Sequence, residues 1–178
     1  MTTVTLIRHA ESAPDHALPE ADWPLSAAGF AQAEALADQL DVEHIYSSPY
    51  VRAVATVAPL ANRLGLEIST VPGLRERKLA EGRLEDWRDQ LARTWHDFDY
   101  RLPGGESSRA CQLRVSESLT QLAEQHTGAR IAAASHGNAI ALFLHTIDPT
   151  FGFEAWSQMR NPDLFEVTWS GSRWAWRR

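Results

Sequence analysis

Two short apolar runs, each ending at a histidine, constrain the fold of this chain more than any other feature. Val4–Ile7 leads into Arg8 and His9, and Ala129–Ser135 leads into His136. Such runs are typical of strands that are buried on both faces of a parallel sheet, and a helix-forming segment follows each of them. Because parallel strands need crossover connections, the pattern predicts an α/β fold.

The chain between and after these runs alternates in the same way. Helical periodicity predicts helices over about 26–40, 50–64, 83–96, 108–125 and 137–144, and β-branched runs predict strands over 4–7, 44–48, 66–71, 129–135, 164–169 and 173–176. The last two strands flank Ser170-Gly171-Ser172 and read as a hairpin antiparallel to the rest. We therefore expect a three-layer α/β/α sandwich, with a mostly parallel central sheet and an antiparallel C-terminal edge.

Two helices carry specific expectations. Ser26 can cap the first helix, whose apolar face is expected to include Phe30, Ala33 and Leu36. In the segment 83–96, Leu84, Trp87, Leu91 and Trp95 recur at helical spacing, which fits either a core-facing helix or a substrate lid. With 178 residues, the chain is expected to form a single domain over residues 1–178, with a small lid as an option at about 74–105.

Composition and charge limit the classes of binding partner and the cellular compartment that are expected. The net charge of -6 argues against binding to nucleic acid or to an anionic membrane through bulk charge. A single cysteine, no leader-like N-terminus and no run of about 20 apolar residues predict a cytoplasmic protein. The oligomeric state, monomer or homodimer, stays open.

The polar residues at the strand ends predict one site. In an open α/β sheet, ligands lie beyond the carboxyl ends of the strands, where Arg8, His9 and His136 are expected to meet. A metal site is disfavoured, because no third ligand with recognisable spacing is present and arginine would repel a cation. Arginine beside histidine suits a phosphoryl group, which needs several N–H donors during in-line attack.

Six short motifs, in order along the chain, resemble those of the histidine phosphatase superfamily, which includes phosphoglycerate mutases and many small-molecule phosphatases. They are Arg8-His9-Ala10-Glu11-Ser12, the run from Pro24 to Ala33, Ser47-Ser48-Pro49-Tyr50-Val51-Arg52-Ala53, Leu74-Arg75-Glu76, the run from Pro103 to Ser107, and Ser135-His136-Gly137. Each motif alone is a weak signal, whereas six in family order are a strong one.

The resemblance implies roles for individual residues. His9 is the nucleophile that becomes phosphorylated, with its other ring nitrogen held by a backbone carbonyl in the loop that follows. Arg8, Arg52 and His136 would surround the transferred phosphoryl group, and backbone N–H groups near Gly137 and Asn138 would add to the phosphate site. Ser12 is a weaker candidate for contact with the substrate. No cofactor is implied.

The resemblance makes Glu76 the proton donor, with Glu81 and Glu106 as alternatives. Two positions depart from the family pattern. Ala10 replaces a glycine, and Asp15 stands where relatives place an asparagine that faces the phosphate. Because a carboxylate there would repel the substrate, we expect Asp15 to lie outside the site.

The reaction expected from these residues is metal-independent hydrolysis of a small-molecule phosphate ester by a phosphoric monoester hydrolase. A mutase needs a phosphohistidine shielded from water, and the chain lacks longer insertions of the kind that would build such a pocket. A phosphoglycerate mutase-type isomerase, a protein phosphohistidine phosphatase and a non-catalytic phosphate-binding module remain the alternatives.

Overall fold

The computed structural model describes residues 1–82 and 84–176. Its strands are β1 (Thr2–Arg8), β2 (His44–Ser47), β3 (Ile68–Thr70), β4 (Arg130–Ser135), β5 (Asp163–Trp169) and β6 (Trp174–Trp176). Its helices are α1 (Ala27–Ala37), α2 (Val51–Leu64), α3 (Trp87–His96), α4 (Ser108–Gln125), α5 (Gly137–Ile147) and α6 (Phe153–Ser157), with short 3₁₀ turns η1 (Glu20–Asp22) and η2 (Pro72–Leu74).

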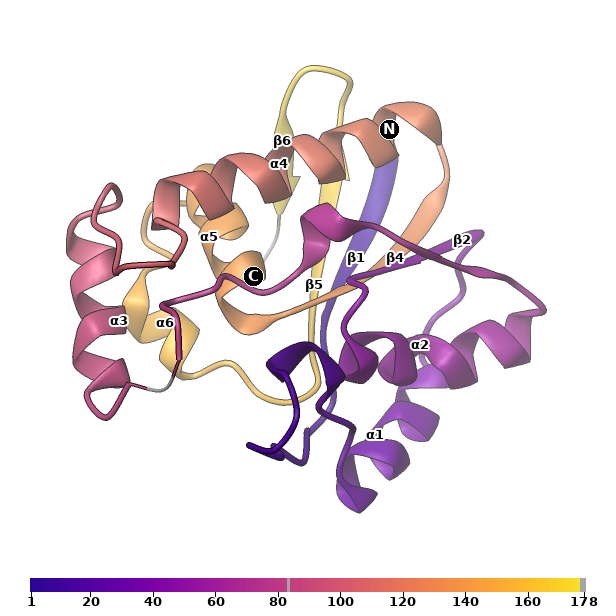
Figure 1. Cartoon of the computed structure of the whole chain (residues 1–178). Coiled ribbons are helices and arrows are strands. Elements are labelled where there is room, and N and C mark those ends of the chain that lie inside the picture. Colours follow the sequence, from indigo (N-terminus) through magenta and orange to yellow (C-terminus); the bar gives the residue numbers. More distant parts are fainter. Residues whose placement is uncertain (83, 177–178) are drawn as a thin grey trace.

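The described strands form one sheet in the order β3-β2-β4-β1-β5-β6. In Figure 1, β5, β1, β4 and β2 of this sheet lie side by side. Strands β1, β2, β3 and β4 pair in parallel, whereas β5 pairs antiparallel with both β1 and β6. The predicted mixed sheet with an antiparallel C-terminal edge is confirmed. The parallel strands point their carboxyl ends toward one edge of the sheet, which is where a ligand site is expected.

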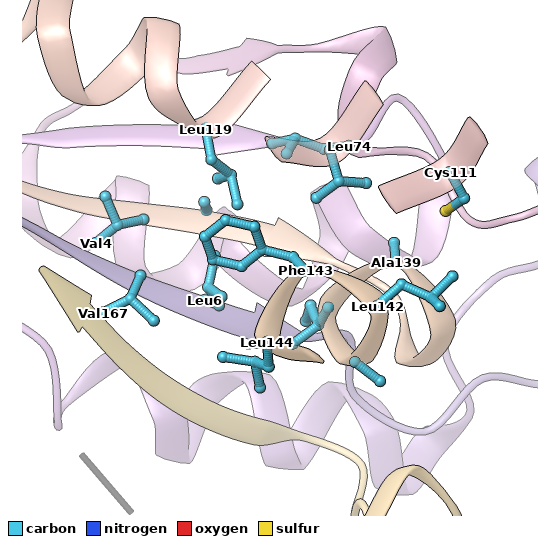
Figure 2. Close-up of a cluster of buried hydrophobic side chains, with 14 of the residues drawn as sticks. Val4, Leu6, Leu74, Cys111, Leu119, Ala139, Leu142, Phe143, Leu144 and Val167 are labelled. Carbon is cyan, nitrogen blue, oxygen red and sulfur yellow. The ribbon is translucent and has the colours of Figure 1, made fainter. Parts of the chain in front are cut away.

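Alternating residues of the central strands enter two different cores. Val4 and Leu6 of β1 pack with Leu119 of α4 and Phe143 of α5 (Figure 2). Ile7, which points to the other face, belongs to a second cluster with helices α1 and α2. Side chains alternate across a strand, so the two clusters lie on opposite faces of the sheet. Helices therefore cover both faces, and β1 is buried between them.

Helix ends follow the local chemistry of the sequence. Ser26 Oγ accepts a hydrogen bond from Gly29 N at 3.0 Å, which confirms the predicted cap of α1. Helix α2 ends at Gly65, whose φ of 67° is the left-handed conformation that closes many helices. This helix carries Arg52 in its first turn, so its start at the sheet edge positions a guanidinium there.

Four details differ from the sequence-based expectations. Phe30 is 54% exposed, because the buried face of α1 instead begins at Gly29 and continues through Ala33 and Leu36. Strand β3 spans only Ile68–Thr70, and α6 was not predicted. The expected helix 83–96 begins at Trp87, and Arg83 lies outside the described residues.

Helix α3 contributes to the core from one face. Leu91 and Trp95 are buried and join the cluster around β1, as expected for a core-facing helix. Trp87, the first residue of the helix, is 47% exposed. Movement of 74–105 as a lid stays a prediction. Among the described residues, no helix is both long and apolar enough to cross a membrane.

Candidate active site

The ends of β1 and β4 bring the two histidines together. Arg8 is the register partner of Ser135, and the backbone N–H of His9 donates to the Ser135 carbonyl at 3.1 Å. The next residue on each strand is a histidine, and the two ring centroids lie 5.2 Å apart. Parallel pairing of two central strands therefore brings together histidines that are far apart in the sequence.

His9 is held in one orientation by a contact on each ring nitrogen. Nδ1 lies 2.7 Å from the carbonyl oxygen of Ala10, and Nε2 lies 3.2 Å from Nε of Arg52. A carbonyl only accepts, so Nδ1 carries the proton and Nε2 keeps its lone pair. Burial lowers the pKa of His9 to about 3, with Arg52 and Arg8 acting in the same direction and the Ala10 carbonyl opposing them. The ring is therefore neutral near pH 7, with Nε2 able to attack an electrophile.

Arg52 reaches His9 from the first turn of α2. Its side chain is only 4% exposed and is bordered by the rings of Tyr50 and Trp23, at 5.0 Å and 5.8 Å from Cζ. The two terminal nitrogens both bond to Glu20, Nη1 to the backbone oxygen at 2.7 Å and Nη2 to Oε1 at 2.8 Å. A buried guanidinium is thus aimed at Nε2 of His9 and balanced by one carboxylate.

Arg8 provides a second guanidinium at the end of β1. Its Nη1 donates to the Met159 carbonyl at 2.7 Å, whereas buried Nε has no hydrogen-bond partner within residues 1–82 and 84–176. Burial lowers the pKa of Arg8, and Glu76 and Asp163 oppose that effect. Gly137 lets α5 approach closely, since a Cβ there would lie 3.3 Å from the Arg8 Cζ. The strand-end arginine is therefore fixed against the start of α5.

His136 lies directly before α5 and is completely buried. Its Nε2 is 2.8 Å from the Ser48 hydroxyl, and Nδ1 has no hydrogen-bond partner in the described part of the chain. Burial lowers the pKa of His136 well below 6.5, and neighbouring Arg52 and His9 add to the effect. The ring is therefore neutral and held by the loop that follows β2.

Glu76 occupies the N-terminus of α5. Its Oε2 accepts from Asn138 N at 3.1 Å, and its Oε1 accepts from Ala139 N at 3.1 Å and from Arg77 N at 2.8 Å. The backbone N–H of Asn138, which we expected to face phosphate, is instead bound to this carboxylate. Helix N-terminal N–H groups attract anions. Here the anion is the Glu76 carboxylate, which the loop after η2 places at the N-terminus of α5.

The two alternative proton donors, Glu106 and Glu81, each bind a basic side chain. Glu106 makes two hydrogen bonds to Arg114, at 2.8 Å and 2.6 Å. Glu81 is 76% exposed and pairs with Lys78. Of the three carboxyls, Glu76 is the one bound to the helix that begins beside His136.

The loop after β1 arranges Ser12 and Asp15 differently. Ser12 forms an isolated backbone bridge with Leu25. Its contact with the substrate stays a prediction. Asp15 is exposed, and its Oδ1 accepts from Ala17 N at 2.9 Å, as in a local turn. This geometry is consistent with the expectation that Asp15 lies outside the site.

Two site neighbours were missed by the sequence reasoning. Glu20 binds Arg52, and Asn161 Nδ2 donates to the backbone oxygen of His9 at 2.7 Å. Neither residue belongs to a motif. Asn-Pro dipeptides favour turns, so Asn161-Pro162 carries no local signal for a contact with His9, and Glu20 lies in the loop where the motif pattern breaks down.

The arrangement as a whole suits an anionic electrophile. A neutral histidine, whose Nε2 accepts from Arg52, lies beside one buried and one half-buried guanidinium group and a second neutral histidine. Guanidinium N–H groups match the oxygens of phosphate in charge and geometry. Within the described residues, no group of three or more His, Cys, Asp or Glu side chains is arranged to hold a metal ion.

Comparisons with known proteins agree with these features. The model of the histidine phosphatase superfamily (branch 1) matches residues 4–178. Proteins described as probable phosphoglycerate mutase GpmB are similar, and the one from Salmonella choleraesuis (strain SC-B67) is 31% identical over 194 residues. That match covers 98% of this chain and 88% of the relative.

Solved structures with the same fold include Bacillus stearothermophilus YhfR, with a TM-score of 0.80 and 22% identity over 99% of this chain and 95% of that one. A mycobacterial glucosyl-3-phosphoglycerate phosphatase has a TM-score of 0.78 and 21% identity, covering 98% of this chain and 96% of that one. A phosphoserine phosphatase mutant from Entamoeba histolytica has a TM-score of 0.76 and 22% identity, covering 100% of this chain and 96% of that one. From the family match and the similarity to GpmB, this chain belongs to the histidine phosphatase superfamily, branch 1.

Proposed function

We propose that this protein is a metal-independent phosphatase that hydrolyses a small-molecule phosphate monoester through a phosphohistidine on His9. The observation that carries the proposal is the state of that ring, which is neutral, is fixed through Nδ1 and keeps its lone pair on Nε2, where Arg52 Nε lies 3.2 Å away. A protonated histidine has no lone pair on either nitrogen and cannot act as a nucleophile.

In the first step, Nε2 of His9 attacks the phosphorus atom. The N–P bond forms, the bond from phosphorus to the ester oxygen breaks, and the electron pair leaves with that oxygen. Arg8, Arg52 and His136 donate to the phosphoryl oxygens as their charge redistributes. Losing one such donor typically lowers kcat by about 10²- to 10³-fold.

Glu76 is assigned the proton transfers. Three backbone N–H groups hold both of its carboxyl oxygens in place. The proton that it passes to the leaving oxygen enters with the monoanion of the substrate. In the second step, Glu76 takes a proton from water, whose oxygen attacks phosphorus. The N–P bond then breaks, its electron pair returns to Nε2, and inorganic phosphate leaves.

A comparison of leaving groups tests the role of Glu76. In Glu76→Gln, kcat for an alkyl phosphate should fall about 10²- to 10⁴-fold, because an alkoxide needs a proton to leave. The loss should be much smaller for p-nitrophenyl phosphate, whose phenolate leaves unprotonated. The control is Glu81→Gln, which alters a carboxyl of the same loop. Equal losses on both esters in Glu76→Gln would contradict the assignment.

A mutase is the second candidate, because the curated relatives are named as probable phosphoglycerate mutases. The two reactions differ in the fate of the phosphohistidine, which passes to water in one and back to substrate in the other. We expect phosphate release from 3-phosphoglycerate or other esters to exceed isomerisation. Sustained interconversion of phosphoglycerates without phosphate release would favour the mutase.

A panel of phosphate esters, assayed with and without chelator, tests the remaining parts of the proposal. We expect turnover that is unaffected by chelator and is lost in His9→Ala. Loss of activity with chelator would contradict metal independence. Turnover confined to phosphohistidine proteins would indicate a protein phosphatase, and phosphate binding without turnover would indicate a non-catalytic module.

A further inference from the structure

Glu20 holds the donors of Arg52 that a phosphate would need. The Arg52 guanidinium has three nitrogens, and each has a partner from the chain: Nε contacts His9 Nε2, Nη1 contacts the Glu20 backbone oxygen, and Nη2 contacts Glu20 Oε1. The Glu20 side chain is 46% exposed, whereas Arg52 is 4% exposed. Without substrate, the solvent side of this guanidinium is therefore covered by a carboxylate.

The turn that carries Glu20 explains how it reaches the site. Residues Glu20–Asp22 form a 3₁₀ turn that contacts α2, the helix whose first turn carries Arg52. Both the carbonyl and the carboxylate of Glu20 bind the guanidinium, so one residue contacts both terminal nitrogens. The carbonyl contact would persist in a variant that lacked only the charge.

The charges around Glu20 favour its replacement on Arg52 by a stronger anion. Burial raises the pKa of Glu20, Arg52 lowers it, and the nearby carboxyl of Glu76 raises it. Glu20 is thus an imperfectly compensated anion close to a second carboxylate. A phosphate carries more charge and more acceptor oxygens than a carboxylate, and guanidinium binds both classes of anion in the same forked geometry.

We infer that Glu20 is an internal competitor for the phosphate site, whose carboxylate occupies Arg52 in the free enzyme and gives way to the phosphoryl group of the substrate or product. The inference rests on the proposed function, because it assumes that Arg52 binds phosphate. Glu20 acts through Arg52 and is a positioning residue: it holds Nε toward His9 and weakens the binding of phosphate in the ground state. Weak ground-state binding speeds release of inorganic phosphate and limits product inhibition.

Binding of inorganic phosphate, measured by titration calorimetry at about pH 7.5, tests the inference. Glu20→Gln removes the charge but keeps an acceptor oxygen, and Glu20→Ala removes both. Asp22→Asn is the matched control, since Asp22 is an exposed carboxylate in the same turn. We expect both Glu20 variants to bind phosphate about three- to tenfold more tightly than the wild type, as expected for loss of a half-exposed ion pair. Asp22→Asn should match the wild type.

The outcomes separate this inference from the proposed function. Unchanged or weaker phosphate binding in both Glu20 variants, with the wild type binding normally, would overturn the competitor role and leave the phosphatase proposal standing. Absence of phosphate binding in all four proteins would overturn both. Steady-state kinetics give a second readout: Glu20→Gln should lower the KM and the inhibition constant of phosphate by similar factors. A purely structural role would instead reduce kcat and thermal stability with no gain in phosphate affinity.

Discussion

The buried neutral His9 should make the protein sensitive to mild acid. Its pKa lies near 6.5 in the unfolded chain and at about 3 in the folded protein, and its side chain is 8% exposed. Between these values the unfolded state holds a proton that the folded state does not. Stability contributed by the neutral ring is therefore fully present above about pH 6.5 and is lost as the pH falls toward 3.

The size of the effect follows from the width of that window. Each pH unit below about 6.5 lowers the free energy of unfolding by about 1.4 kcal/mol, so a drop to about pH 5 should cost about 2 kcal/mol through His9. His9→Asn removes the titrating group. The wild type should therefore lose about 2 kcal/mol more stability than His9→Asn between about pH 7.5 and pH 5.

Urea unfolding at the two pH values measures this difference. His136, whose pKa is lowered mainly by burial, is present in both proteins. His16→Asn is the control for loss of one imidazole from the chain, because this histidine is exposed. Parallel losses of stability in the wild type and His9→Asn would refute the claim that folding holds His9 neutral.

Two further predictions concern the support of the site. Gly29→Ala should lower the free energy of unfolding by about 1–3 kcal/mol or more in urea titrations, because a Cβ would overlap the Glu11 carbonyl oxygen; Gly152→Ala, which has open space around it, should not. Asn161→Ala removes the 2.7 Å hydrogen bond to the His9 backbone and should lower kcat about three- to tenfold. A wild-type kcat in that variant would contradict a positioning role for Asn161, and exposed Asn62 provides a control.

Features encoded by neighbouring residues could be predicted from the sequence. The strand ends at Arg8 and Ser135, the Ser26 cap and the closing Gly65 all depend on local periodicity and capping chemistry, and the structure contains each of them. The parallel sheet follows from them, because buried strands need crossover helices. The meeting of His9 and His136 follows in turn from the parallel pairing of their strands.

Features that depend on tertiary packing could not be predicted in this way. The periodicity of α1 admits Phe30 on the buried face, but the close approach of the Glu11 backbone selects Gly29 instead. Asn161 contacts a residue 152 positions away, and no local pattern marks such a pair. The sequence indicated that the backbone N–H of Asn138, at the start of a helix, could bind phosphate. In the folded chain this N–H donates to Glu76 instead.

Trapping of the phosphorylated enzyme tests the central claim most directly. The enzyme is mixed with ³²P-labelled substrate, quenched in alkali within the first turnover, and digested to find the labelled peptide. We predict label on the peptide that contains His9, stable in alkali and released by acid because the bond is P–N, and none in His9→Asn. Label that survives acid, or equal labelling of His9→Asn, would contradict a phosphohistidine at this position.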